Sequence, residues 1–216
     1  MKKIIILFLI IFILLISCNR ENSDIKNNLN EIMVSVGPEP QSIDPTINSA
    51  IDAMIYTTHL FENLTIKDEN GNIIPGTAES WISSNNNTIY IFNIRSNAKW
   101  TDGVPVRAND FVYAWKRIVD PKSGSSYSIY LDVIKNAHDI ILGNMDKDKL
   151  SVKALDDNTL YVELEYPAPY FPELITHTSY TPLREDIVSK NEDGWTLSAE
   201  TMIGNGAFKL VKWEHD

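Results

Sequence analysis

The side chains most able to do chemistry in this 216-residue chain are its histidines, its carboxylates and its single cysteine. No two histidines are three or four residues apart, as metal ligands on one helix face would be. The four are His59, His138, His177 and His215. Nucleophile elbows, zinc-binding helix motifs, paired cysteines and phosphate-binding glycine loops are all missing from the sequence. The residues therefore predict no enzyme, no cofactor and no metal site.

Glu163 and Glu165 are the carboxylates whose spacing could place them on one face of a strand. A catalytic acid and base pair needs one carboxyl in an apolar pocket, because only then do the two pKa values separate. The sequence shows no such pocket. We expect the two glutamates to lie on a solvated edge, and the alternative of an acid and base pair stays open.

Cys18 lies at the end of an N-terminal targeting segment. Two lysines precede an apolar run over residues 4–16, which is too short to span a bilayer and is typical of a signal peptide. Residues 15–18 read Leu-Ile-Ser-Cys, which resembles the lipobox of bacterial lipoproteins. This predicts a signal peptide over residues 1–17 and attachment to a membrane outside the cytoplasm, at the periplasm or cell surface, through lipid on Cys18. The alternative is an uncleaved membrane anchor.

The chain is acidic, with a formal net charge of −10. Removal of the two leader lysines leaves 17 basic against 29 acidic side chains, or −12. A strongly acidic surface repels phosphate backbones, so we expect no nucleic-acid partner.

Beyond the leader, strands and helices alternate. Residues 18–30 are polar and predict a tether. Alternating or β-branched patterns predict strands over residues 31–36, 88–94, 151–155, 159–165 and 207–213, and Asn70-Gly71 predicts a hairpin turn. The run over residues 88–94 is apolar enough to suit a strand covered on both faces. This alternation favours a mixed α/β or α+β fold.

Helical spacing recurs in three places. The apolar stripe Ile51, Met54, Ile55, Thr58 and Phe61 predicts one helix, and the spacing from Phe111 to Val119 predicts a second. Residues 127–143 predict a further helical segment that ends at a glycine. Trp100, Phe111 and Trp115 are expected to form core, with the latter two on one helix face.

Five ordered strings in the sequence resemble those of the extracellular solute-binding proteins of family 5, the oligopeptide and dipeptide receptors of ABC importers. They are "EPQSIDP" (39–45), "LFENLTIKDENGNIIPGTAESW" (60–81), "YIFNIRSNAKWTDGVPVRANDFVYAWKRIVDP" (90–121), "VKALDDNTLYVELEYPAPYF" (152–171) and "GNGAFKLVKWE" (204–214). Two positions depart from the family pattern. Asn63 replaces a common glycine, and Arg107 replaces the threonine that would cap the following helix unless Asn109 takes that role.

The resemblance implies a lobe of the type II periplasmic-binding-protein kind with a smaller inserted domain. It places the first segment of lobe one at residues 31–61, the inserted domain at residues 62–184 and an incomplete return segment at residues 185–216. It puts the second lobe after Asp216. The lobes of such receptors close over a ligand by a hinge motion.

The implied function is reversible binding of peptides and their delivery to the permease subunits of an ABC importer, without turnover. Relatives of this family also carry nickel complexes and sugars, so these ligands stay open. Two other classes stay open as well, an extracellular hydrolase and a chaperone-like or adhesin-like lipoprotein.

The resemblance also implies which residues bind ligand. The loop Asn48, Ser49, Ala50 and Ile51 matches a segment whose backbone pairs with an extended peptide, although the same residues could only cap the next helix. Tyr127 matches a tyrosine that lines the peptide site, and its alternative role is packing at a helix start. His177 matches a position near the cleft, and its alternative is a structural histidine.

Overall fold

The computed structural model describes residues 37–214. The predicted signal peptide, the tether, the lipidation site at Cys18 and the strand at residues 31–36 lie outside the described residues, as does His215. Within the described range, no helix has the length and apolar character that a membrane crossing requires.

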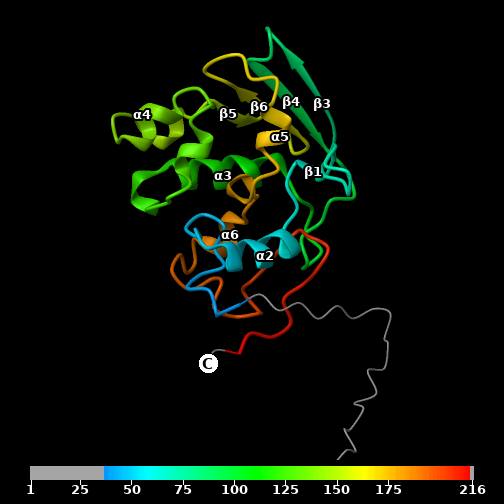
Figure 1. Ribbon diagram of the computed structural model, residues 1–216, viewed down its shortest axis with the longest axis vertical. Helices are drawn as coiled ribbons and strands as arrows, with labels where there is room; N and C mark the ends of the chain where they lie inside the picture. Colours follow the sequence, from blue (N-terminus) through cyan, green and yellow to red (C-terminus); the bar gives the residue numbers. More distant parts are fainter. Residues whose placement is uncertain (1–36, 215–216) are drawn as a thin grey trace, which may run out of the picture. The chain divides into compact units, whose positions relative to one another are not determined.

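The larger sheet of the fold has four antiparallel strands in the order β3-β4-β6-β5 and lies at one edge of the molecule (Figure 1). Its strands are β3 (Ala78–Ser84), β4 (Ile89–Ile94), β5 (Val152–Ala154) and β6 (Thr159–Glu163). β4 buries Tyr90, Phe92 and Ile94 on one face, whereas the side chains on its other face are half-buried. The expectation that both faces would be covered was therefore wrong, because only one layer of helix packs on the sheet.

The predicted hairpin is confirmed as β1 (Thr65–Lys67) and β2 (Ile73–Pro75), paired antiparallel. Gly71 has a φ of +82°, a conformation that glycine adopts without steric cost. Asn70-Gly71 therefore turns the chain as the dipeptide predicts.

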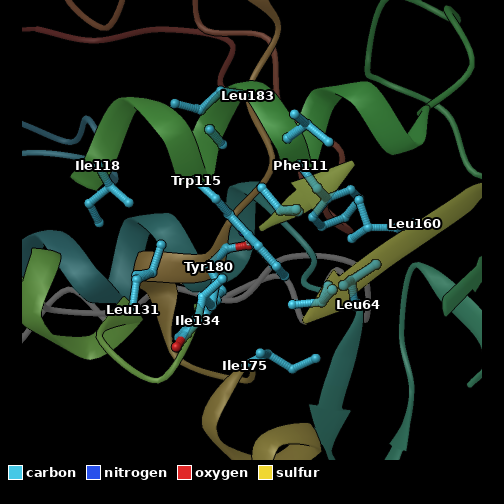
Figure 2. Close-up of a cluster of buried hydrophobic side chains, with 14 of the residues drawn as sticks. Leu64, Phe111, Trp115, Ile118, Leu131, Ile134, Leu160, Ile175, Tyr180 and Leu183 are labelled. Carbon is cyan, nitrogen blue, oxygen red and sulfur yellow. Dashed lines mark hydrogen bonds between the residues drawn. The ribbon is translucent and has the colours of Figure 1, made fainter. Parts of the chain in front are cut away.

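Helix α3 (Ala108–Val119) packs against strands β5 and β6 and supplies much of the core (Figure 1). Trp115 and Phe111 are fully buried and Trp100 is 2% exposed, which confirms the three as core. Figure 2 shows Trp115 projecting from α3 toward Tyr180, whose ring it meets edge-on at 5.2 Å. The Trp115 indole N–H also donates to the Tyr180 carbonyl at 3.0 Å, so the ring has no unsatisfied donor.

The first turn of α3 is capped without the missing threonine. The Asp110 carboxylate accepts the Arg107 backbone N–H at 2.9 Å and the Trp100 indole N–H at 3.0 Å. Burial raises the pKa of this carboxyl above its ordinary value. Half of a capping box therefore remains at the helix start, and it is tied to a core tryptophan.

Helix α2 (Ile51–Leu60) forms where predicted, but its buried face is not the predicted stripe. Ala53, Thr57 and Leu60 are buried, whereas Ile51 is 76% exposed. The return segment determines which face of α2 is buried, because its backbone passes close to the end of this helix. A Cβ on Gly204 would lie 2.0 Å from the Leu60 carbonyl oxygen, so only glycine allows this approach.

Two other predicted elements differ in the structure. Residues 127–143 hold two short helices, η2 (Ser128–Leu131) and α4 (Ala137–Ile141), because Asn136 takes a left-handed φ of 71° between them. Residues 207–213 form no strand, since no strand of residues 37–214 pairs with them. The remaining elements are η1 (Pro121–Ser123), η3 (Lys147–Lys149), α5 (Phe171–Leu174), η4 (Thr178–Tyr180) and α6 (Glu185–Val188).

The return segment is hydrogen-bonded to the chain near residue 62. The Asn205 side chain accepts the Glu62 N–H at 3.0 Å and donates to the Glu62 carbonyl at 2.9 Å. It also donates to the Thr77 hydroxyl at 3.2 Å. These contacts join the return segment to the predicted inserted domain, and the division of the chain at residues 61/62 and 184/185 stays a prediction.

A buried ion pair fixes the N-terminal loop. Asp44 is 2% exposed and pairs through both carboxylate oxygens with Arg117 of α3, at 3.0 and 2.9 Å. The same carboxylate accepts the Trp195 indole N–H at 3.0 Å. One aspartate thereby connects the start of the described chain, α3 and the return segment.

Candidate functional site

Tyr127 and Ser49, which are 78 residues apart in sequence, meet in the structure. The Tyr127 hydroxyl donates a hydrogen bond to the Ser49 carbonyl at 3.2 Å. Tyr127 is half-buried at the start of η2, and Ser49 lies in the exposed loop before α2. Two of the predicted site segments are therefore on the same side of the molecule.

Tyr127 also belongs to an aromatic cluster, which we define as Tyr127, Tyr130 and His177. The His177 and Tyr130 rings are stacked with centroids 4.4 Å apart and planes 7° apart. Tyr127 meets both rings edge-on, at 5.3 Å from His177 and 5.4 Å from Tyr130. Each ring therefore limits the movement of the other two.

His177 is held in a defined orientation. Its Nδ1 accepts the backbone N–H of Ser179 at 3.2 Å and lies 2.8 Å from the Ser179 hydroxyl. A nitrogen that accepts an amide N–H carries no proton, so the neutral ring holds its proton on Nε2. Burial lowers the pKa of His177 below its ordinary value, which favours this neutral form at pH 7.

The Asn63 side chain is hydrogen-bonded to the backbone of His177. Its side-chain amide donates to the His177 carbonyl at 2.8 Å. The glycine that the family pattern places here has no side chain to do this. The departure from the family pattern at position 63 therefore contacts a candidate site residue.

The four predicted loop residues, Asn48, Ser49, Ala50 and Ile51, differ in their solvent exposure. The buried Asn48 side chain accepts the Ala50 N–H at 2.8 Å, and Ala50 is the residue before α2. The alternative weighed for this loop was that it caps α2, but Ala50 is the N-cap and no side chain caps the helix, so Asn48 only stabilises the turn before it. Ser49, Ala50 and Ile51 are exposed, although both backbone groups of Ala50 already form hydrogen bonds within the chain.

A groove runs beside the aromatic cluster. One hollow of about 480 Å³ is lined in part by Tyr130, His177, Tyr170, Met54, Thr58 and Lys67. A second hollow of about 300 Å³ shares Thr58, Lys67, Thr176 and Thr178 with the first and ends at Asn63. We call the two together the groove. His177 lines it directly, whereas Tyr127 reaches it through its contacts with His177 and Tyr130.

Sequence reasoning missed Tyr130, Tyr170 and the residues of α2 that face the groove. Tyr130 lies three residues after Tyr127, and that spacing brings two side chains to one side of a helical turn. Met54 and Thr58 belong to the apolar stripe that predicted helix α2. In the structure this stripe forms one wall of the groove.

Glu163 and Glu165, which were expected on a solvated edge, are half-buried and exposed, and each has a different partner. Glu163 forms an ion pair with Lys135 at 2.6 Å, and the Glu165 carboxylate accepts the Asn136 N–H at 3.4 Å. Both lie at the end of β6, away from the groove residues. Across residues 37–214, no three histidine, cysteine or acidic side chains are grouped as metal ligands would be.

Known proteins resemble this chain over most of its length. OppA of Salmonella typhimurium, a periplasmic oligopeptide-binding protein, is 43% identical over 179 residues, which cover 82% of this chain and 33% of OppA. The dipeptide-binding protein DppE of Bacillus subtilis is 40% identical over 178 residues, with 82% and 33% covered. The chain thus spans about a third of the length of these relatives.

Solved structures show the same fold at similar identity. Haemophilus influenzae OppA in complex with the peptide RPPGFSPFR matches with a TM-score of 0.80 and 40% identity, over 83% of this chain and 35% of that one. Listeria monocytogenes OppA bound to peptide matches with a TM-score of 0.77 and 35% identity, over 80% and 34%. The model of the bacterial extracellular solute-binding proteins, family 5, matches residues 72–216. The chain belongs to this family of solute-binding proteins.

Proposed function

We propose that this chain provides one wall of the ligand site of a peptide receptor, which works outside the cytoplasm and delivers its ligand to the permease subunits of an ABC importer. The observation that carries the proposal is the hydrogen bond between Tyr127 and Ser49 beside the groove. Relatives named as oligopeptide-binding and dipeptide-binding proteins support a peptide as the ligand.

The arrangement suits ligands of varied sequence. An exposed loop at residues 49–51 offers backbone groups that can pair with an extended peptide whatever its side chains are. Tyr130 and Tyr170 are 39% and 49% exposed, so they offer flat apolar faces to those side chains. In this proposal, residues 31–61 and 185–216 belong to lobe one and residues 62–184 to the inserted domain.

A binding experiment with a matched pair of variants tests the proposal. Peptide should raise the melting temperature increasingly with its concentration, because a ligand at 100 times its Kd adds about 2.7 kcal/mol of stability. Tyr127→Phe should weaken peptide binding, whereas Tyr161→Phe on β6 should leave it unchanged. Stabilisation by a sugar or a nickel complex and not by peptides would contradict the peptide assignment.

Two further parts of the proposal have their own tests. Incubation with a peptide mixture should leave every peptide intact by mass spectrometry, and loss of any peptide would favour a hydrolase. For the membrane attachment, mass spectrometry of the mature protein should find lipid on Cys18. Replacement Cys18→Ser should release the protein from the membrane fraction.

A further inference from the structure

The Asn63 end of the groove contains an unusual number of hydrogen-bond acceptors. The hydroxyls of Thr57, Thr58 and Thr176 donate to the carbonyls of Ala53, Met54 and Glu173 at 3.0, 2.8 and 2.8 Å. A hydroxyl that has given its proton to a carbonyl can only accept further hydrogen bonds. Three of the groove's threonines therefore present lone pairs rather than protons.

Asn63 adds a fourth acceptor. Its amide N–H donates to the His177 carbonyl, which leaves the oxygen Oδ1 for other partners. In the part of the chain that the structure describes, this oxygen is buried and has no hydrogen-bond partner. Asn63 is 8% exposed and lines the 300 Å³ hollow. A buried acceptor of this kind costs free energy until a donor reaches it.

Lys67 lines both hollows of the groove and forms an ion pair with Glu173, which lines the larger one. Their ammonium and carboxylate groups are 3.0 Å apart, and the two side chains are 46% and 60% exposed. Lys67 is the one lysine or arginine among the described residues that line the groove. The Lys67 ammonium thus already occupies the position beside Glu173. An exposed ion pair of this kind is weak, so another cation can replace Lys67 there.

Resting on the proposed function, we propose that this part of the groove is a subsite for a cationic side chain of the bound peptide. The ammonium of a ligand lysine, or the guanidinium of an arginine, replaces Lys67 at Glu173 and donates to the Thr58 and Thr176 hydroxyls, which line the same hollow as Glu173. Lys67 then turns into solvent. The net charge of −10 favours the approach of a cation and disfavours an acidic side chain.

Replacement of Lys67 and replacement of Glu173 should change the selectivity for a cationic side chain in opposite directions, which provides the test. The ratio of affinities for Ala-Lys-Ala and Ala-norleucine-Ala, measured by NMR titration of the full chain, isolates the ammonium from the rest of the peptide. Glu173→Gln should lower this ratio about fivefold, the upper range for an exposed ion pair. Lys67→Gln should raise the ratio, because Glu173 no longer has an internal partner.

Controls separate this inference from the proposed function. Glu163→Gln removes a carboxylate from a comparable pair on the sheet, between Lys135 and Glu163, and should leave the ratio unchanged. Binding of the norleucine peptide reports the proposed function, and the ratio reports the subsite. If the norleucine peptide binds but Glu173→Gln leaves the ratio unchanged, or Ala-Glu-Ala binds more tightly, the subsite is wrong and the proposed function stands.

Two other binding results would contradict more than the role of Glu173. Binding of neither peptide would overturn the proposed function together with the subsite. Butylamine that binds as tightly as Ala-Lys-Ala would overturn the assignment to a peptide side chain, because the groove would then recognise a free amine.

Discussion

Trp115 and Tyr130 belong to two aromatic regions that both contact Tyr180 but differ in solvent exposure. Trp115 is fully buried between α3 and Tyr180. Tyr130 is 39% exposed, although its backbone carbonyl accepts the Tyr180 hydroxyl at 2.5 Å. Tyr180 thus connects the core to the aromatic cluster. The comparison teaches that similar residues stabilise the fold on one side of Tyr180 and stay available to a ligand on the other.

Replacement of Trp115 gives the largest expected contrast between the regions. Trp115→Ala removes a fully buried ring and a satisfied indole N–H, so it should lower the free energy of unfolding by about 3–5 kcal/mol. Tyr130→Ala should cost less than about 1.5 kcal/mol, because much of its ring already meets solvent. Urea unfolding of both variants measures the two losses. Equal losses would show that Tyr130 is a core residue.

The Asp44 network should have the next largest effect. Asp44→Asn leaves the Arg117 guanidinium, whose side chain is 16% exposed, without its charged partner. An uncompensated buried charge of this kind should cost about 3 kcal/mol. The double variant Asp44→Asn, Arg117→Met should recover part of that stability, since no charge then remains buried. A double variant less stable than the single one would refute this explanation.

Tyr127→Phe should have a small effect on stability and a clear effect on binding. The variant loses one neutral hydrogen bond to Ser49, worth about 1 kcal/mol, while the ring contacts remain. Peptide affinity should fall because the loop at residues 49–51 is no longer held. Thermal unfolding and peptide titration together separate the two quantities, and a loss of stability without a loss of affinity would assign Tyr127 to the fold.

His177 should give the smallest effect, a dependence of stability on pH. Burial lowers its pKa in the folded state, so below about pH 6.5 the unfolded chain binds more protons than the folded one. The stability from this residue is complete above that pH and is lost as the pH falls through the lowered pKa. The slope cannot exceed about 1.4 kcal/mol per pH unit for one proton. His177→Gln should flatten it in urea titrations from pH 5 to 7.5.

The core could be predicted from the sequence because its signals are local. The spacing from Phe111 to Val119, the β-branched run in β4 and Asn70-Gly71 each lie within one element. The face of α2 could not be predicted in this way. The approach of Gly204 to Leu60, from about 140 residues further along the chain, decides which side of α2 is covered. Met54 and Thr58 of the apolar stripe therefore line the groove.

The candidate site was predicted in part. The family resemblance indicated Ser49, Tyr127 and His177, because the positions of ligand residues are carried by its motifs. The resemblance could not indicate Asn63, because the family pattern has glycine there and the sequence does not show that this position lies under His177. Tyr130 was missed although its spacing from Tyr127 places both side chains on one side of the predicted helical turn.

The most direct test of the account is an NMR titration of the chain with a short peptide, with the backbone signals assigned. We expect the signals of Ser49, Tyr127 and His177 to shift together and saturably, with one Kd, while those of Lys153 and Tyr161 on the sheet remain still. Saturable shifts confined to the sheet, or no saturation at these three residues, would contradict the claim that the loop and the aromatic cluster form one ligand-binding wall.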